Sequence, residues 1–416
     1  MKSTDRTIGL PKFLTHWLAV TAATIALSAC QLSPPGSGGP TGTPPPAVPP
    51  PPPIAFDDAV LKAANELFSK VQLPTGSSAR QPLVIDPLVD GVTGAQSAAT
   101  RSMEQKIVDL VRHQHPRFEV EAFTTANLAQ QPLVLVGTFT PINNSAGQPT
   151  GERDAFRICL ALADLKTGKV IAKGVARARP NGVDVAPQPF DADSPAWTRD
   201  PAIDGYIKTC QGSKAGDPIN AVYADRILAA ALINDATNAY NARRYRESLE
   251  LYRSALRTPG GEQLRAYNGV YLASWKLKRR DEAIQAYARI VDYGLANRQL
   301  SVKFLFRPGS TQFWADAQIS GPYPLWLNQI AQRSAHSKAC LEIIGHTSRS
   351  GPEPLNERLS VLRAQAIKDR LEAVAAELAK RTIASGVGSR ENLVGTGADD
   401  ASDALDRRVE FKVIGC

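Results

Sequence analysis

The chain has 416 residues, 43% of them hydrophobic and 21% charged, which is ordinary globular usage and excludes a wholly disordered protein. Its length predicts two to four modules, and no internal run approaches about 20 apolar residues, which excludes a membrane protein with many spans. The formal net charge of +8 is a mild basic excess that suits an anionic surface or polymer as well as nucleic acid.

The first 30 residues have the pattern of a secretory signal. A basic start precedes a short apolar core at 18–27, and the segment ends Leu-Ser-Ala-Cys at Cys30. This ending resembles the lipobox of bacterial lipoproteins, whose cysteine is freed by cleavage and diacylated. We therefore expect a signal peptide at 1–29 and a lipid on Cys30; the alternative is an uncleaved signal anchor. In this lipoprotein family, the residue after the lipidated cysteine directs the protein to one of the two membranes. Gln31 in place of aspartate implies the outer membrane of a Gram-negative cell, with the protein facing the periplasm.

Residues 30–55 are expected to form a proline-rich tether, because eleven of the 31 prolines fall between Gln31 and Pro53. Polyproline is stiff and extended, at about 3.1 Å per residue, so the tether would hold the folded part away from the membrane. A disordered spacer is the alternative, and both leave the globular part outside the bilayer.

Residues 56–215 are expected to form an α/β domain. Helices are predicted at 59–71 and 97–113, and strands at 82–88, 118–123, 133–139, 156–162 and 169–176. Asp164 to Lys169 predicts a hairpin turn. The element order, Val84-Ile85-Asp86-Pro87-Leu88, Thr93-Gly94 and the turn Leu165-Lys166-Thr167-Gly168 resemble the small domain of penicillin-binding-protein activators and of a flagellar outer-membrane lipoprotein family. The resemblance implies a module that contacts another protein.

Residues 220–297 are expected to be helical and repetitive. Glu247 to Tyr252 aligns with Glu282 to Tyr287 at an offset of 35 residues. A period near 34 resembles the tetratricopeptide repeat. Two repeats are fewer than such arrays need, so the segment should lean on its neighbours; the alternative is a plain helical hairpin packed between two domains.

Residues 300–416 are predicted to form a β-α-β-α-β arrangement, with strands at 302–306, 340–344 and 408–414 and helices from 325 and 356. The chain as a whole is thus expected to be a multi-domain α/β protein. Four motifs follow in order: Gly345-His346-Thr347-Ser348-Arg349-Ser350-Gly351, Asn356-Glu357-Arg358-Leu359-Ser360, Arg363-Ala364 and Arg407-Arg408-Val409-Glu410. They resemble the C-terminal peptidoglycan-binding domain of the OmpA-like family.

This resemblance implies a site for a peptidoglycan stem peptide. Its implied residues are Thr347, Ser348, Asn356, Leu359, Arg363, Arg407 and Arg408. Spacing alone places Asn356, Ser360 and Arg363 on one helix face, and Asn356 also suits a helix N-cap. An arginine can grip a carboxylate in a bidentate fork, and the N–H groups where a loop enters a helix favour an anion.

One position departs from the family pattern: Ser348 stands where the family has an aspartate that takes the diaminopimelate ammonium. Losing this charge would cost roughly 1–2 kcal/mol, or about one decade of affinity. Three interpretations stay open: weaker binding, substitution by a carboxylate such as Glu353 or Asp400, or loss of wall binding. Asp406 replaces an asparagine of the pattern and could pair with an arginine. Phe306 could line the ligand cleft or belong to the hydrophobic core of the domain.

Four cysteines remain beside the lipidated one: Cys159, Cys210, Cys340 and Cys416. In an oxidising compartment they can pair, and of the three possible pairings the domain boundaries favour Cys159–Cys210 and Cys340–Cys416. The alternative is four buried free thiols. The OmpA-like fold places the final strand antiparallel between the other two, which implies the Cys340–Cys416 bond.

No catalytic, metal or cofactor motif is present, so we expect no enzyme, no cofactor, no metal site and no nucleic-acid partner. The expected function is that of an outer-membrane lipoprotein that binds peptidoglycan non-covalently and tethers or positions envelope components. The alternative is an assembly or regulatory factor of a secretion, flagellar or wall-synthesis machine. It would hold a protein partner through residues 57–297, with wall binding weakened or lost. A wall-modifying enzyme is a weaker third possibility.

Overall fold

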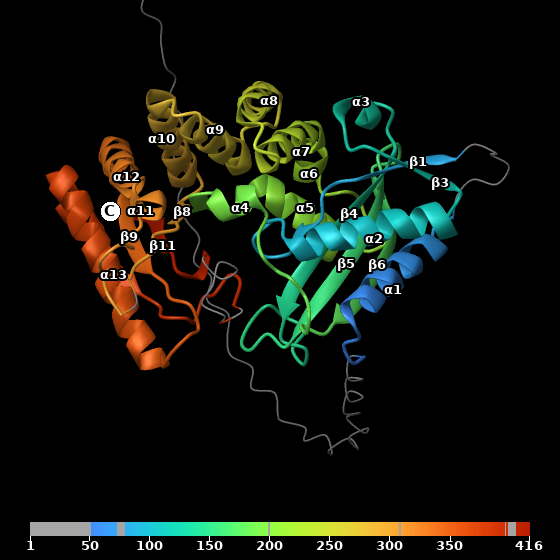
Figure 1. Cartoon of the computed structure of the whole chain (residues 1–416), viewed down its shortest axis with the longest axis horizontal. Helices are drawn as coiled ribbons and strands as arrows, with labels where there is room; N and C mark the ends of the chain where they lie inside the picture. The colour runs from blue at the N-terminus through green and yellow to red at the C-terminus, as the bar shows by residue number, and fades with distance from the viewer. Residues whose placement is uncertain (1–50, 73–79, 199, 308, 396, 398–404) are drawn as a thin grey trace, which may run out of the picture. The chain divides into compact units, whose positions relative to one another are not determined.

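The computed structural model describes residues 51–72, 80–198, 200–307, 309–395, 397 and 405–416 (Figure 1). The expected signal peptide, Cys30, most of the tether and Asp400 lie outside the described residues. Within these ranges, no helix is both long enough and apolar enough to cross a membrane.

The first sheet is mixed, with the strand order β3-β1-β4-β5-β6 and with β2 paired to β4. Its strands are β1 (Gln81–Ile85), β2 (Val89–Asp90), β3 (Phe118–Glu121), β4 (Leu133–Ile142), β5 (Ala155–Asp164) and β6 (Lys169–Ala178). β1 is parallel to β3 and β4, whereas β4, β5 and β6 form an antiparallel meander. The hairpin turn is confirmed: Asp164 accepts hydrogen bonds from the Lys166 N–H at 2.9 Å and the Thr167 hydroxyl at 2.8 Å.

Helices cover both faces of this sheet. On one face lie α1 (Phe56–Ser69) and α2 (Ala98–Gln114), side by side (Figure 1). α2 begins with a capping box, in which Ser97 and Thr100 exchange hydrogen bonds. The other face packs against α5 (Pro201–Gln211), α6 (Ala221–Ala224) and Ile227. The short helices α3 (Thr125–Leu128) and α4 (Pro189–Asp193) lie in connections.

The strand predicted over 82–88 is interrupted. β1 ends at Ile85 and β2 starts at Val89, and Asp86 and Pro87 lie between them. Proline has no N–H for a strand ladder, so the pairing stops there.

Two helical pairs follow. They are α7 (Ile227–Asn241) with α8 (Tyr245–Arg257), and α9 (Leu264–Lys276) with α10 (Arg280–Ala296). The buried aromatic residues of these helices belong to the same core as the second sheet, so the segment does lean on a neighbour as expected. Its assignment to the tetratricopeptide family stays a prediction.

The second sheet has the strand order β10-β9-β11-β8-β7. Its elements are β7 (Ala196–Trp197), β8 (Gln299–Val302), α11 (Ala317–Ser320), α12 (Tyr323–Ser337), β9 (Cys340–Gly345), α13 (Glu353–Val374), a 3-10 turn (Ala376–Lys380), β10 (Thr382–Gly386) and β11 (Val409–Ile414). β11 runs antiparallel to both β8 and β9 and lies between them. The expected central place of the last strand is therefore correct.

Two expectations for this sheet need correction. The strand predicted over 302–306 is β8, which starts at Gln299 and ends at Val302, because the chain bends where the Phe304 N–H donates to the Val302 carbonyl. The predicted β-α-β-α-β series also lacks β10, which pairs in parallel with β9. β7 then adds a further edge strand from residues that precede the helical segment.

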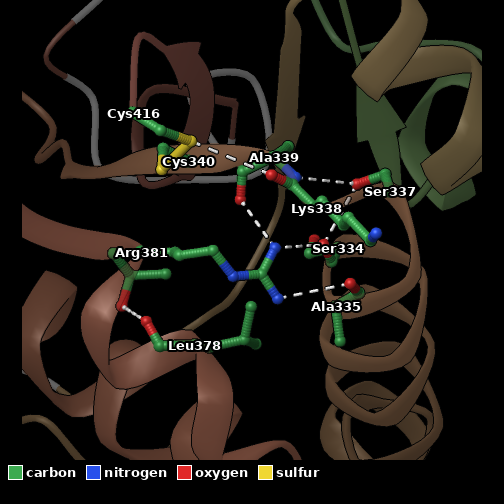
Figure 2. The surroundings of a disulfide bond; sticks show 10 residues. Ser334, Ala335, Ser337, Lys338, Ala339, Cys340, Leu378, Arg381 and Cys416 are labelled. Carbon is green, nitrogen blue, oxygen red and sulfur yellow. Dashed lines mark hydrogen bonds between the residues drawn. A yellow bond between two sulfur atoms is a disulfide. The ribbon is translucent and has the colours of Figure 1, made fainter.

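The Cys340–Cys416 disulfide is present, with Cα atoms 5.3 Å apart (Figure 2). Beside it, the Arg381 guanidinium donates to the carbonyls of Ser334, Ala335 and Ala339, where α12 ends. A cation at a helix C-terminus satisfies carbonyls that have no partner within the helix.

The second expected disulfide is not formed in the structure. Cys159 on β5 and Cys210 on α5 are free thiols, with their Sγ atoms 2.8 Å apart. Each thiol donates to the carbonyl of the other residue, at 2.9 and 3.0 Å, so both are satisfied without a bond.

Candidate functional site

The candidate site lies where β9 runs into the loop before α13. Gly345 ends β9 and Gly386 ends β10, and both lie against Ser360 of α13. A Cβ atom on Gly345 would lie 2.0 Å from the Ser360 carbonyl oxygen, so the helix could not approach the sheet this closely with any larger residue. Ser360 uses this proximity: its hydroxyl oxygen accepts from the Gly388 N–H at 3.0 Å.

Asn356, Ser360 and Arg363 all lie on the buried face of α13, as their spacing predicts. The N-cap expectation is wrong. α13 begins at Glu353, with Pro352 at its N-cap and Pro354 in its first turn, where prolines are favoured. Asn356 instead lies one turn inside the helix, and its amide nitrogen donates back to the carbonyls of Ser350 and Gly351 at 3.1 and 3.4 Å. It therefore closes the loop rather than capping the helix.

Arg363 is buried and contacts the segment after β8. Its guanidinium donates to the Ser310 carbonyl at 3.2 Å and to the Arg307 carbonyl at 3.3 Å. Its central carbon lies 4.8 Å from the ring centre of Phe306, a cation–π distance. Phe306 is thus both part of the core and the support for this arginine.

The loop residues Thr347 and Ser348 are buried. Ser348 Oγ lies 3.0 Å from Ser350 Oγ. The Thr347 hydroxyl has no hydrogen-bond partner within the described parts of the chain, although its atom is fully buried. Leu359 is half-buried on α13. Glu353, considered as a substitute for the missing aspartate, is held by the N–H and hydroxyl of Ser389.

Arg407 and Arg408 face different surroundings. Arg408 is buried, and its guanidinium lies 3.7 Å from Glu410 and donates to the Glu391 carbonyl. Burial lowers the pKa of Arg408. Burial, together with the charge of Arg408, lowers the pKa of His346 to about 2, so the imidazole is neutral and its 3.7 Å approach to Glu410 is no ion pair. Arg407 is half-buried and lines a separate cavity with Tyr323.

Three further residues position the site, and sequence reasoning did not assign them these roles. Asp406 does not need an arginine partner: its two oxygens accept the N–H groups of Leu393, Val394 and Gly395, at 2.7, 2.9 and 2.7 Å. Asn392 donates its amide to the Thr347 carbonyl at 2.9 Å.

The third residue, Arg153, comes from the connection between β4 and β5. Its guanidinium donates to the carbonyls of Asn392 at 2.7 Å, Leu393 at 2.9 Å, and Val394. Arg349 of the candidate loop donates in return to the Gly151 carbonyl at 2.7 Å. A separation of about 240 residues leaves no local sequence signal for this contact.

No protein-family model and no curated protein matches the chain. Solved structures that resemble it include an outer-membrane protein from Borrelia burgdorferi B31, 26% identical, with 28% of this chain and 88% of that one covered and a TM-score of 0.22. The peptidoglycan-associated lipoprotein from Burkholderia pseudomallei is 25% identical, with 29% and 93% covered and a TM-score of 0.23. The cell wall anchor of the T6SS from Pseudomonas aeruginosa is 25% identical, with 31% and 97% covered and a TM-score of 0.24. Each alignment takes in under a third of this chain.

Proposed function

We propose that the chain binds peptidoglycan non-covalently through residues 300–416, as an outer-membrane lipoprotein held by Cys30. The observation that carries this proposal is the buried Thr347 hydroxyl, which lacks a partner in the described part of the chain, in a loop fixed by Asn356 and Asn392. A buried polar atom without a partner is costly unless a ligand supplies one. Together with the four motifs, it supports a stem-peptide carboxylate as the ligand.

In this proposal the site holds the stem peptide without chemical change. Arg363 and the loop N–H groups face the carboxylate, and Ser348 offers a neutral hydroxyl to the ammonium. The proline-rich tether and the lipid on Cys30 would connect this site to the outer membrane. Residues 57–297 would then position a protein partner near the wall.

Co-sedimentation of the full chain, purified in detergent, with peptidoglycan sacculi tests the proposal. Arg363→Ala should abolish pelleting, whereas Arg358→Ala, on an exposed position of the same helix, should not change it. Ser348→Asp should strengthen pelleting by about tenfold, because a charge-assisted bond replaces a neutral one. Circular dichroism checks that the buried Arg363 variant still folds. Absence of pelleting by the unaltered chain would overturn the proposal.

A further inference from the structure

The residues proposed to bind the stem peptide, in the loop 345–351, on α13 and at 407–408, are called the candidate wall site below. A cavity of about 210 Å³ lies outside it. It is lined by the turn before α2, by β4 and β5, by the segment from α4 to Asp200, by the start of α9, and by Lys303, Val394 and Leu405. None of the seven residues proposed to bind the stem peptide lines it, although Val394 belongs to the segment 392–395 beside that site. Most of its wall is apolar, and Phe139, Phe156 and Phe190 contribute rings. Cavities of roughly 150 Å³ already hold benzene, so this one has room for a ligand of amino-acid size.

Three side chains at this cavity carry a buried polar atom with no hydrogen-bond partner among the described residues. Gln96 Oε1 and Asn268 Oδ1 are unpaired acceptors, and the two residues are only 6% and 4% exposed. The amide nitrogen of Asn268 donates to the Ala196 carbonyl at 2.9 Å, which fixes the orientation of the amide. Arg265 Nε is an unpaired donor. A buried polar atom without a hydrogen-bond partner is costly, so three around one cavity point to a ligand that completes them.

The charges at the cavity have both signs. Arg265 forms no ion pair with any carboxylate of the described residues. Asp191 also lines the cavity, and its Oδ2 accepts the N–H of Gln96 at 3.1 Å. Lys303 does not neutralise it by direct contact, because the ammonium donates to the backbone carbonyls of Asp191 and Ala192 at 3.0 and 2.9 Å. Arg265 and Asp191 thus both line the cavity and act on each other only through space, without a direct ion pair.

We propose that this cavity binds a zwitterion with an apolar body, namely an apolar amino acid or a short peptide with free termini. The ligand carboxylate accepts a charge-assisted hydrogen bond from the Arg265 guanidinium. The ligand ammonium donates to Asp191, Gln96 Oε1 and Asn268 Oδ1, which need donors. The apolar side chain lies against the phenylalanine rings and adds the burial that such pockets supply.

Isothermal titration of the full chain in detergent tests the ligand class. The probes are phenylalanine, alanyl-phenylalanine, 3-phenylpropionate, which lacks the ammonium, and phenethylamine, which lacks the carboxylate. At least one of the two zwitterions should bind, and which one does separates a free amino acid from a peptide. Each single-charge analogue should bind at least tenfold more weakly. No binding by either zwitterion, or equal binding by the analogues, would overturn the proposal.

Variants test the site. Arg265→Gln should weaken zwitterion binding at least tenfold, whereas Arg257→Gln, an exposed position on α8, should leave it unchanged. Gln96→Met keeps the volume and removes the unpaired acceptor. It should weaken binding while the unliganded chain keeps or raises its melting temperature, because a buried unpaired atom is lost. Unchanged affinity in both cavity variants would place the ligand elsewhere and contradict the assignment.

Discussion

The carboxyl group of Asp86 is buried, directly after the end of β1. The residue is 5% exposed, and its Oδ2 accepts a hydrogen bond from the Tyr223 hydroxyl at 2.7 Å. Burial raises the pKa of Asp86 from 3.8 to about 7, against the opposing effect of the Tyr223 bond. Folding therefore favours the protonated acid.

This shift predicts a pH dependence of stability. The pKa of Asp86 is higher in the folded than in the unfolded protein. Its contribution to the free energy of unfolding is therefore complete below about pH 4 and is lost as the pH rises through 7. The loss amounts to about 4 kcal/mol at 1.36 kcal/mol per pKa unit. Asp86→Asn removes the titration and keeps an acceptor for Tyr223. Between pH 4 and pH 8, the wild-type free energy of unfolding in urea should fall by about this amount relative to the variant. An equal change in both proteins would contradict the assignment.

At the scale of elements, patterns carried by neighbouring residues were predictable. The offset of 35 residues reappears in the backbone: Arg243 and Lys278, which each lie two residues after the end of α7 or α9, have φ values of 61° and 60°. The N–H groups that follow, of Arg244 and Arg279, donate back to Ala239 and Ser274 at 2.8 and 2.9 Å. The spacing along α13 is local in the same way, so it placed three site residues on one face.

Elements whose pairing is distant were not predictable. β10 reads Thr-Ile-Ala-Ser-Gly, whose small residues give little strand signal, and it exists because it pairs with β9. β7 has two residues and forms by pairing with β8, about 100 positions later. Arg153 and Asn392 stayed hidden for the same reason, since each acts on a partner far away in the sequence.

The Cys340–Cys416 disulfide ties the start of β9 to the end of β11, across a separation of 76 residues. In the chain-entropy account, closing a loop of this length in the unfolded state contributes about 4 kcal/mol. Cys416→Ser should therefore lower the free energy of unfolding by up to about that amount, measured in urea without reductant. Cys159→Ser, which removes a thiol outside any disulfide of the structure, is the control for the loss of one sulfur atom. Equal unfolding midpoints for wild type and Cys416→Ser would contradict a bond in solution.

At the scale of the whole molecule, the second sheet does not close its core alone. Tyr271 and Tyr287 of the helical pairs belong to the same buried cluster as Phe411 of β11. Trp326 of α12 donates to the Tyr271 hydroxyl at 2.7 Å and stacks on Tyr287. The candidate wall site is therefore tied by packing to the helices before it, and experiments on it belong in the full chain.

Arg153 connects the first sheet to residues 392–394, and Asn392 in turn contacts the candidate loop. Arg153 and Asp406 bind the backbone of residues 392–395 from two sides. Asn392 then fixes the candidate loop, because its amide donates to the Thr347 carbonyl. Arg153→Ala removes the donors for the carbonyls of residues 392–394, so the N–H groups of 393–395 should exchange with deuterium faster, by about tenfold for a loss near 1.4 kcal/mol. If the loop binds peptidoglycan, pelleting with sacculi should fall in parallel.

Arg117→Ala is the matched control, since this exposed arginine lies in the same module and its side chain is not needed for the loop. It should leave both exchange and pelleting at the wild-type level. Faster exchange in Arg153→Ala with unchanged pelleting would mean that the first module orders the loop without serving wall binding. Unchanged exchange would show that Arg153 does not order residues 393–395. Exchange and pelleting together thus decide whether the module that precedes the helices tunes the candidate wall site or only packs beside it.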